Sequence, residues 1–248
     1  MQIVNIATYR FVPLAELARL KQTLLVQAQA EALKGTILLA EEGINLFLAG
    51  SATGIDTFVR QALDSDVRLR GLDLKRSYSD TQPFKRLKIK IKKEIVTFKQ
   101  TGINPALQPA KEISPQQLKQ WLDEGRDVLL LDTRNEFEYR AGAFKQAVQL
   151  GNHNFVDFAE KVKNLPLDQQ AQWKQKTVVS FCTGGIRCEK AAPFLSAEGY
   201  QHVLQLKGGI LRYFEEVGKA HYEGDCFVFD ERRALDPTLA PAAAPTSL

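Results

Sequence analysis

The decisive stretch of the sequence reads Cys182-Thr-Gly-Gly-Ile-Arg187-Cys188 and directly follows the apolar run Thr177-Val-Val-Ser-Phe181. A helix-like segment, Glu189-Lys-Ala-Ala-Pro-Phe-Leu195, comes next. A strand, a short glycine-containing loop and a helix in this order aim several backbone N–H groups at the Cys182 sulfur, and Arg187 adds a full positive charge. Such surroundings lower the pKa of a thiol and stabilise an anion carried on it. The alternative, a buried structural cysteine, fits poorly with glycines and an arginine this close.

The spacing Cys-x4-Arg between Cys182 and Arg187 narrows the chemistry. Cysteine phosphatases use Cys-x5-Arg, a loop wide enough for a tetrahedral phosphate, so phosphatase activity is disfavoured. The shorter loop resembles that of rhodaneses, whose cysteine carries a terminal sulfur as a persulfide. Cys182 and Arg187 are therefore the candidate catalytic residues. The other residues of the candidate active-site loop are Thr183, Gly184, Gly185, Ile186 and Cys188.

A second cluster supports the resemblance to rhodaneses. The run Asp127-Val-Leu-Leu-Leu-Asp132-Thr-Arg134 is typical of a buried strand that ends in an acid and a base, and it leads into Glu138-Tyr-Arg-Ala-Gly142-Ala-Phe144. This resembles the rhodanese pattern Asp-x-Arg-x-x-x-Glu-Tyr-x-x-Gly-His-Ile, with Ala143 where many rhodaneses have histidine. We expect Asp132, Arg134 and Glu138 to support the structure by pairing and hydrogen bonding rather than to touch substrate.

Composition sets bounds on location and class. The chain of 248 residues is long enough for two ordinary domains. No apolar run approaches the roughly 18 residues of a membrane span, and the N-terminus lacks the basic flank and apolar core of a signal peptide. Three cysteines make no disulfide framework and no zinc pattern, so no metal is expected. The expected location is the cytoplasm, with no membrane and no obligate protein partner.

The order of elements predicts an α/β fold with two domains. The first half indicates strands at 3–11, 36–40, 44–48 and 87–92, a helix opened by Pro13 and a helical stripe over 55–63, which favours a ferredoxin-like α+β sheet with helices on one face. The second half alternates helices (115–124, 155–162, 188–198, 210–217) with strands (128–132, 178–181, 202–206). This alternation predicts a rhodanese-like α/β domain with a central parallel sheet and helices on both faces.

The predicted boundaries follow from these elements. They are a ferredoxin-like domain at 1–98, a linker at 99–113, a rhodanese-like catalytic domain at 114–220, a C-terminal extension at 221–234 and a disordered tail at 235–248. In a parallel sheet, ligands bind at the carboxyl ends of the strands, which is where the Cys182 loop falls.

The basic residues concentrate in the first half of the chain. Residues 1–110 hold 16 lysines and arginines against 10 acids, whereas residues 111–248 hold 17 against 19. The strand at 87–92 alternates, and its cations Arg86, Lys88, Lys90 and Lys92 share one face. Cations in line at about 6.6–7 Å spacing would track a phosphate backbone. A solvated, lysine-protected edge is the alternative; the local charge balance favours RNA binding.

Three motifs in order carry a closer resemblance: Glu41-Glu-Gly-Ile-Asn45, the Cys182–Lys190 loop and Phe227-Val-Phe-Asp-Glu-Arg232. Together they resemble the bacterial tRNA uridine hydroxylases built on a rhodanese domain, over roughly residues 1 to 234. The resemblance implies oxygen-dependent 5-hydroxylation of the wobble uridine in tRNA, an oxidoreductase activity with the anticodon loop as partner and Cys182 as the catalytic cysteine. Molecular oxygen would be the co-substrate. No Gly-x-Gly-x-x-Gly nucleotide fingerprint occurs, so no further cofactor is expected.

Two alternatives to hydroxylation stay open: a sulfurtransferase that works through a Cys182 persulfide, and a non-catalytic tRNA-binding or redox-sensing module. Within the hydroxylase hypothesis, a Cys182 thiolate could add to carbon 6 of uracil and make carbon 5 nucleophilic, or the sulfur itself could carry the oxidant. Cys188 could resolve an oxidised Cys182 or only pack in the first helical turn; packing is the favoured interpretation.

Overall fold

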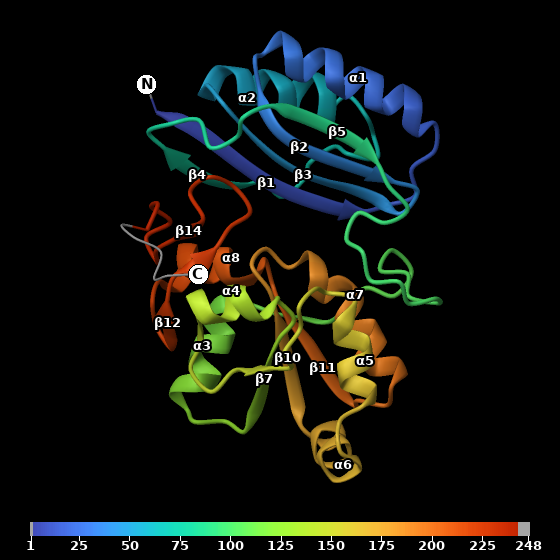
Figure 1. Ribbon diagram of the computed structural model, residues 1–248, viewed down its shortest axis with the longest axis vertical. Coiled ribbons are helices and arrows are strands. Elements are labelled where there is room, and N and C mark those ends of the chain that lie inside the picture. The colour runs from blue at the N-terminus through green and yellow to red at the C-terminus, as the bar shows by residue number, and fades with distance from the viewer. Residues whose placement is uncertain (1, 243–248) are drawn as a thin grey trace. The chain divides into compact units, whose positions relative to one another are not determined.

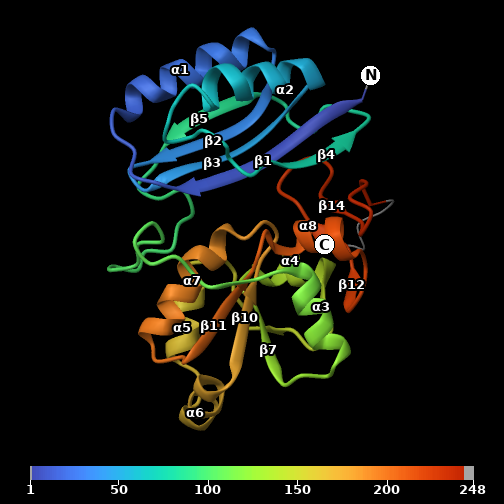
Figure 2. The same cartoon turned by 180° about the vertical axis from the view of Figure 1, so that it is seen from behind.

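The computed structural model describes residues 2–242, which form two compact units (Figures 1 and 2). The N-terminal unit holds the chain up to Thr97 together with Asp230–Arg232. The C-terminal unit holds Phe98–Phe229 and the segment from Arg233 onward.

The N-terminal unit is a five-stranded sheet with both of its helices on one face (Figure 1). Its elements are β1 (Ile3–Phe11), α1 (Leu17–Ala30), β2 (Lys34–Ala40), β3 (Gly43–Gly50), α2 (Ala52–Phe58) continued by a π-helical turn (Val59–Leu63), β4 (Lys75–Ser79) and β5 (Leu87–Ile91). The strand order is β4-β1-β3-β2-β5, antiparallel throughout except that β5 runs parallel to β2. The expected ferredoxin-like sheet is confirmed in the order of the first four strands.

Alternation along the strands decides which face the helices cover. In β3, Ile44, Leu46 and Leu48 are buried in one cluster with Leu24 of α1 and Phe58 of α2. Residues between them on the strand point to the opposite, helix-free face. The sheet therefore has one apolar face for its core and one face that carries the remaining side chains.

One strand of this sheet was not predicted, and it changes the role of another. The fourth ferredoxin strand is β4, which pairs with β1, whereas the expected strand at 87–92 is an additional fifth strand beside β2. The sequence of β4, Lys-Arg-Ser-Tyr-Ser, has no apolar alternation to mark it. The first helix also begins at Leu17 rather than at Pro13, because Val12 and Leu14 still donate backbone hydrogen bonds to the β2–β3 turn.

The C-terminal unit is built on a parallel sheet of order β6-β11-β10-β7-β9. Helices α3 and α8 lie on one side of it and α5 and α7 on the other (Figures 1 and 2). The sheet strands are β6 (Glu112–Ile113), β7 (Val128–Asp132), β9 (Val148–Gln149), β10 (Thr177–Phe181) and β11 (His202–Leu206). The helices are α3 (Pro115–Asp123), α4 (Glu136–Ala141), α5 (Asp157–Lys163), α6 (Leu167–Gln175), α7 (Ile186–Ala197) and α8 (Gly209–Val217). The expected central parallel sheet is confirmed.

Two small antiparallel pairs complete this unit: β12 (Tyr222–Gly224) with β8 (Gly142–Phe144), and β13 (Cys226–Phe227) with β14 (Ala234–Leu235). Helices α4 and α6 were not predicted, because each is short and mostly polar. Helix α7 begins at Ile186, two residues earlier than expected, because Gly185 (φ 100°) turns the chain directly into it. This start places Arg187 and Cys188 in the first helical turn.

The expected linker and tail are partly ordered. The linker ends in β6, which pairs with β11. The tail expected to be disordered from 235 begins with β14, and the Asp236 side chain then accepts backbone hydrogen bonds from Thr238 and Ala240. This aspartate turn holds a segment whose Pro/Ala composition favours disorder. Residues 243–248 of that tail lie outside the described residues. Within residues 2–242, no helix is long and apolar enough to span a membrane.

Candidate active site

The Cys182 sulfur lies at the centre of a short loop at the carboxyl end of β10. Cys182 directly follows Phe181, the last residue of β10, and α7 begins four residues later. The Gly185 N–H donates to the Cys182 sulfur at 3.1 Å, and the Arg187 N–H is a second backbone donor to it. The whole Cys182 residue is buried. The expected strand–loop–helix geometry thus brings backbone donors to this sulfur.

The start of α8 holds the same loop from the other side. Ile210 N–H donates to the Cys182 carbonyl at 3.0 Å, and Leu211 N–H donates to the Thr183 carbonyl at 3.1 Å. Gly209 makes this approach possible, since a Cβ on it would lie 2.4 Å from the Cys182 carbonyl oxygen and its φ is +66°. The Gly208-Gly209 pair therefore helps to hold the Cys182 loop in place.

A buried ion pair joins the loop to α4. Arg187 donates through both terminal nitrogens to Glu138, at 2.6 and 2.8 Å. Glu138 also accepts from the Asn135 N–H at 3.1 Å and from the Thr183 hydroxyl at 3.3 Å. Burial alone would raise the pKa of Glu138, but the charge and hydrogen bonds of Arg187 outweigh it and hold that pKa below its usual value. The Arg187 guanidinium is thus committed to Glu138 and acts on the sulfur through its charge and its backbone N–H.

The loop favours the ionised form of Cys182. Burial opposes ionisation, but the hydrogen bond from the Cys188 thiol, the charge of Arg187 and the two backbone N–H donors together lower the pKa of Cys182 to about 5. At neutral pH this sulfur is a thiolate, the reactive form of cysteine. Burial and the neighbouring sulfur raise the pKa of Cys188 well above its usual value, so Cys188 remains a protonated donor.

Thr133 lies next to Cys188 and was not singled out from the sequence. Its hydroxyl donates to the Phe181 carbonyl at 3.0 Å and lies 3.6 Å from the Cys188 sulfur. It therefore fixes Cys188 relative to the end of β10. The one signal in the sequence is its place between Asp132 and Arg134.

Asp132 and Arg134 form a fully buried ion pair at the end of β7. The Arg134 Nη2 lies 2.7 Å from an Asp132 carboxylate oxygen and donates to the Gly142 carbonyl at 2.7 Å. The Tyr222 hydroxyl donates to the same carbonyl at 2.7 Å. The pair ties β7 to the β8–β12 pair and has no direct hydrogen bond to Cys182.

The candidate RNA-binding cations belong to the N-terminal unit. Lys88 and Lys90 lie in β5, and Arg86 and Lys92 flank it. Arg86, Lys90 and Lys92 are exposed and Lys88 is half-buried. The candidate residues thus fall into two groups, the sulfur loop in the C-terminal unit and the basic strand in the N-terminal unit.

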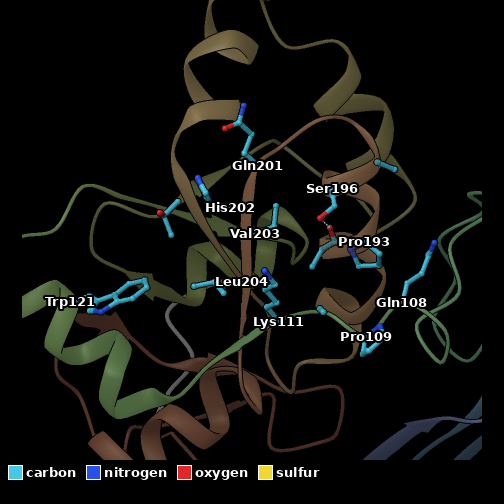
Figure 3. Close-up of a pocket in the computed structure, with 14 residues that line it drawn as sticks. Gln108, Pro109, Lys111, Trp121, Pro193, Ser196, Gln201, His202, Val203 and Leu204 are labelled. Carbon is cyan, nitrogen blue, oxygen red and sulfur yellow. Dashed lines mark hydrogen bonds between the residues drawn. The ribbon is translucent and has the colours of Figure 1, made fainter.

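A pocket of about 590 Å³ lies elsewhere in the C-terminal unit, between Trp121 of α3 and Pro193 of α7 (Figure 3). Thr177 and His202, the first residues of β10 and β11, line it. Cys182 follows the opposite end of β10, and none of the candidate catalytic residues lines this pocket. Within residues 2–242, no three His, Cys, Asp or Glu side chains gather closely enough to hold a metal ion.

Comparison with known proteins agrees with this architecture. One family model, described as a UPF0176 acylphosphatase-like domain, matches residues 3–95, and a rhodanese-like domain model matches residues 114–216. A protein of Bordetella petrii is 52% identical, with 99% of this chain and 98% of that protein covered. Proteins of Cupriavidus metallidurans (50% identical; 98% and 86% covered) and Delftia acidovorans (51%; 96% and 90%) are similarly related. All three are named tRNA uridine(34) hydroxylase. With this identity over nearly its full length, the chain belongs to the same bacterial family, in which an acylphosphatase-like domain precedes a rhodanese-like domain.

Proposed function

We propose that this protein hydroxylates carbon 5 of the wobble uridine in tRNA, with molecular oxygen as co-substrate and Cys182 as the reacting residue. The observation that carries the proposal is the Cys182 sulfur, buried among hydrogen-bond donors with its pKa lowered to about 5. The substrate is inferred from the name of the relatives, tRNA uridine(34) hydroxylase. The proposal invokes no resident cofactor. A tRNA substrate is consistent with a cytoplasmic location.

The thiolate is suited to activating uracil. Carbon 5 of uracil is a poor nucleophile until a nucleophile adds to carbon 6. The Cys182 thiolate would form the bond to carbon 6, and the electron pair of the C5–C6 double bond would move toward the carbon 4 oxygen. Carbon 5 then reacts as an enolate carbon with an oxygen electrophile. An external two-electron reductant would supply the electrons that take the second oxygen atom of O2 to water. Loss of the proton from carbon 5 would then re-form the C5–C6 double bond and expel the Cys182 thiolate, which the N–H groups of Gly185 and Arg187 would stabilise. A wobble base lies in a single-stranded loop, so it can enter a pocket without opening a duplex.

The helix-free face of the N-terminal sheet supports tRNA binding. The strand register aligns one row across this face: Lys88, Thr36, Phe47, Ala7 and Lys75. Lys90 and Lys34 lie on the same face in neighbouring rows, and none of the five strands contains an aspartate or glutamate. Strands that present cations on this face and contain no carboxylate of their own suit a phosphate backbone. We therefore propose that Arg86, Lys88, Lys90 and Lys92 contact tRNA phosphates.

A rhodanese-type sulfurtransferase is the second candidate, because the Cys-x4-Arg loop and the rhodanese-like family model also suit a persulfide on Cys182. Transfer of sulfur from thiosulfate or a protein persulfide requires the reactive cysteine but neither oxygen nor the basic sheet. The two functions therefore differ in their dependence on oxygen and on tRNA.

Nucleoside mass spectrometry tests the proposal directly. tRNA is taken from cells that lack this protein and from the same cells complemented with the wild type or with Cys182→Ser. We expect 5-hydroxyuridine-derived nucleosides to disappear in the deletion and to return only with the wild type. If the nucleosides are the same in all strains, the hydroxylase proposal fails, and thiosulfate and persulfide assays decide the second candidate.

A further inference from the structure

Three phenylalanines of the C-terminal unit form a cluster on its surface, here called the aromatic cluster: Phe137, Phe227 and Phe229. Phe137 lies in α4, Phe227 ends β13 and Phe229 follows two residues later. The ring centroids are 5.0 Å apart for Phe137–Phe227, 5.2 Å for Phe227–Phe229 and 6.3 Å for Phe137–Phe229. Each pair meets nearly at right angles, with interplanar angles of 82–87°.

The cluster is exposed where phenylalanine is ordinarily buried. Phe229 is 61% exposed and Phe137 is 36% exposed. By contrast, Phe144, Phe158 and Phe181 of the same unit are buried in its core. Because edge-to-face packing uses the edge of one ring against the face of its neighbour, it leaves much of the Phe229 ring open to an incoming planar group. An exposed, preformed aromatic group of this kind marks an interaction site.

The cluster is attached to the catalytic loop from two directions. Phe137 directly precedes Glu138, which holds Arg187 through two hydrogen bonds. The Thr183 hydroxyl lies 3.3 Å from a Glu138 carboxylate oxygen and 3.5 Å from the Phe227 carbonyl oxygen. Thr183 itself follows Cys182 in the loop. The backbone segments that carry the aromatic rings are therefore tied to the Cys182 loop through Glu138 and Thr183.

We propose that the aromatic cluster stacks bases of the anticodon loop next to the reacting uridine, and that Phe229 is its principal contact. This inference rests on the proposed function, which brings a single-stranded RNA loop to Cys182. Unstacked bases of such loops are held by stacking on aromatic side chains, and the contact is tolerant of sequence because every base has a π-face. Stacking of neighbouring bases on the cluster would hold the loop open while the wobble base enters the site. Phe137, Phe227 and Phe229 are then substrate-binding residues, and Thr183 and Glu138 position them.

The test measures binding of an unmodified anticodon stem-loop RNA and, separately, kcat and KM for full tRNA. Phe229→Leu retains an apolar side chain but loses the ring, whereas Phe229→Trp retains a stacking surface. We expect Phe229→Leu to weaken stem-loop binding about 5-fold or more and to raise KM by a similar factor, with Phe229→Trp close to wild type. Phe137→Leu should act in the same direction with a smaller effect, because that ring is less exposed.

The matched control is Leu167→Ala in α6, which removes an even more exposed apolar side chain (83%) from the same unit. As a control of folding, we expect iodoacetamide to alkylate Cys182 at the same rate in Phe229→Leu and in the wild type. Equal rates would show that the loop is intact in the variants compared. Stem-loop affinity of Phe229→Leu within 2-fold of wild type would overturn the inference, as would equal losses in Phe229→Leu and Leu167→Ala. Because binding is measured without turnover, a wild-type protein that binds the stem-loop through Phe229 but forms no 5-hydroxyuridine would refute the proposed function alone.

Discussion

Removing the Cys188 thiol should raise the pKa of Cys182 measurably. The structure gives this sulfur four sources of stabilisation: the Cys188 thiol, the charge of Arg187 and the N–H groups of Arg187 and Gly185. Burial acts against all of them. In Cys188→Ala one donor to a charged sulfur is lost inside the protein, where no water replaces it. A hydrogen bond to a charged group contributes about 1.5–3 kcal/mol, which corresponds to roughly 1–2 pKa units.

The pKa of Cys182 should therefore move from about 5 to roughly 6–7 in Cys188→Ala. Because the thiolate is the species that alkylates, the rate at pH 6 should fall about 2- to 10-fold and recover at pH 8–9, where both proteins are ionised. The assay is iodoacetamide labelling from about pH 4 to 9, with peptide mass spectrometry to follow Cys182 alone. Burial raises the pKa of the remaining cysteine, Cys226, to about 12, so it contributes no thiolate in this range.

Two variants make the result specific. Cys188→Ser keeps a hydroxyl donor and should keep most of the low pKa, although it can form no disulfide. Cys226→Ala removes a buried thiol that bonds to the Phe227 carbonyl, at 3.8 Å, and to Thr183 but not to Cys182, and it should leave the titration of Cys182 unchanged. An unchanged midpoint in Cys188→Ala would refute the assignment of Cys188 as a donor. Loss of turnover in Cys188→Ser with a normal midpoint would instead establish the resolving role.

Gly209→Ala should disrupt the Cys182 loop, because the new methyl group would lie 2.4 Å from a loop carbonyl oxygen at a φ of +66°. Chemical denaturation should show a loss of stability of about 1–3 kcal/mol, and the pKa of the Cys182 thiol should rise. Gly218→Ala, also at positive φ but with open space around it, should share only the backbone cost. Lys88→Gln with Lys90→Gln should weaken tRNA binding and reduce the slope of log K against log salt by about 1.4–1.8, since each lost phosphate contact lowers it by about 0.7–0.9. The control replaces Arg19, an exposed cation of α1, by Gln; equal slopes for the wild type and the double variant would contradict the role of β5.

The geometry of the Cys182 loop could be predicted from the sequence because its parts are contiguous. The strand, the cysteine, the glycines and the helix start lie within a dozen residues, and their local geometry follows from the residue types. The pairing of Arg187 with Glu138 could not be predicted in this way, since 49 positions separate the two residues. Burial of both side chains, which makes the pair possible, is a property of the assembled sheet and its helices.

In the N-terminal sheet, the sequence predicted one edge strand and missed the other. Its fifth strand was predicted from the alternation Leu-Lys-Ile-Lys-Ile, but β4 was missed because its sequence is polar on both faces. Ser77 and Ser79 of β4 instead make specific polar contacts: the Ser79 hydroxyl accepts from Asn5 at 3.0 Å, and the Ser77 hydroxyl accepts from Arg232 at 2.7 Å. A strand stabilised by such polar contacts shows no alternation of apolar and polar residues in its sequence, so only the tertiary structure identifies it.

The sequence contains the phenylalanines of the aromatic cluster but does not predict that they are exposed. The motif Phe227-Val-Phe-Asp-Glu-Arg232 supported the family resemblance, and the alternation of its two phenylalanines is that of a strand face. Most phenylalanines in this chain are buried, so the residue type alone predicts a core position. The same motif ends in Asp230–Arg232, which belongs to the N-terminal unit, where Arg232 is held by Asp230 at 2.6 Å. One short motif thus contributes to both units.

The pairing of Arg187 with Glu138 also determines how Cys182 can be both ionised and reactive. A lone guanidinium beside the sulfur would stabilise the thiolate strongly and reduce its tendency to attack. Because Glu138 neutralises Arg187, the sulfur feels the field of a dipole, which is weaker than that of an isolated charge. The short-range donors, Cys188 and the two backbone N–H groups, must then supply much of the stabilisation. In the proposed reaction, these hydrogen bonds stabilise the thiolate before it attacks uracil and again as it leaves, so the geometry favours a sulfur that is ionised and still nucleophilic.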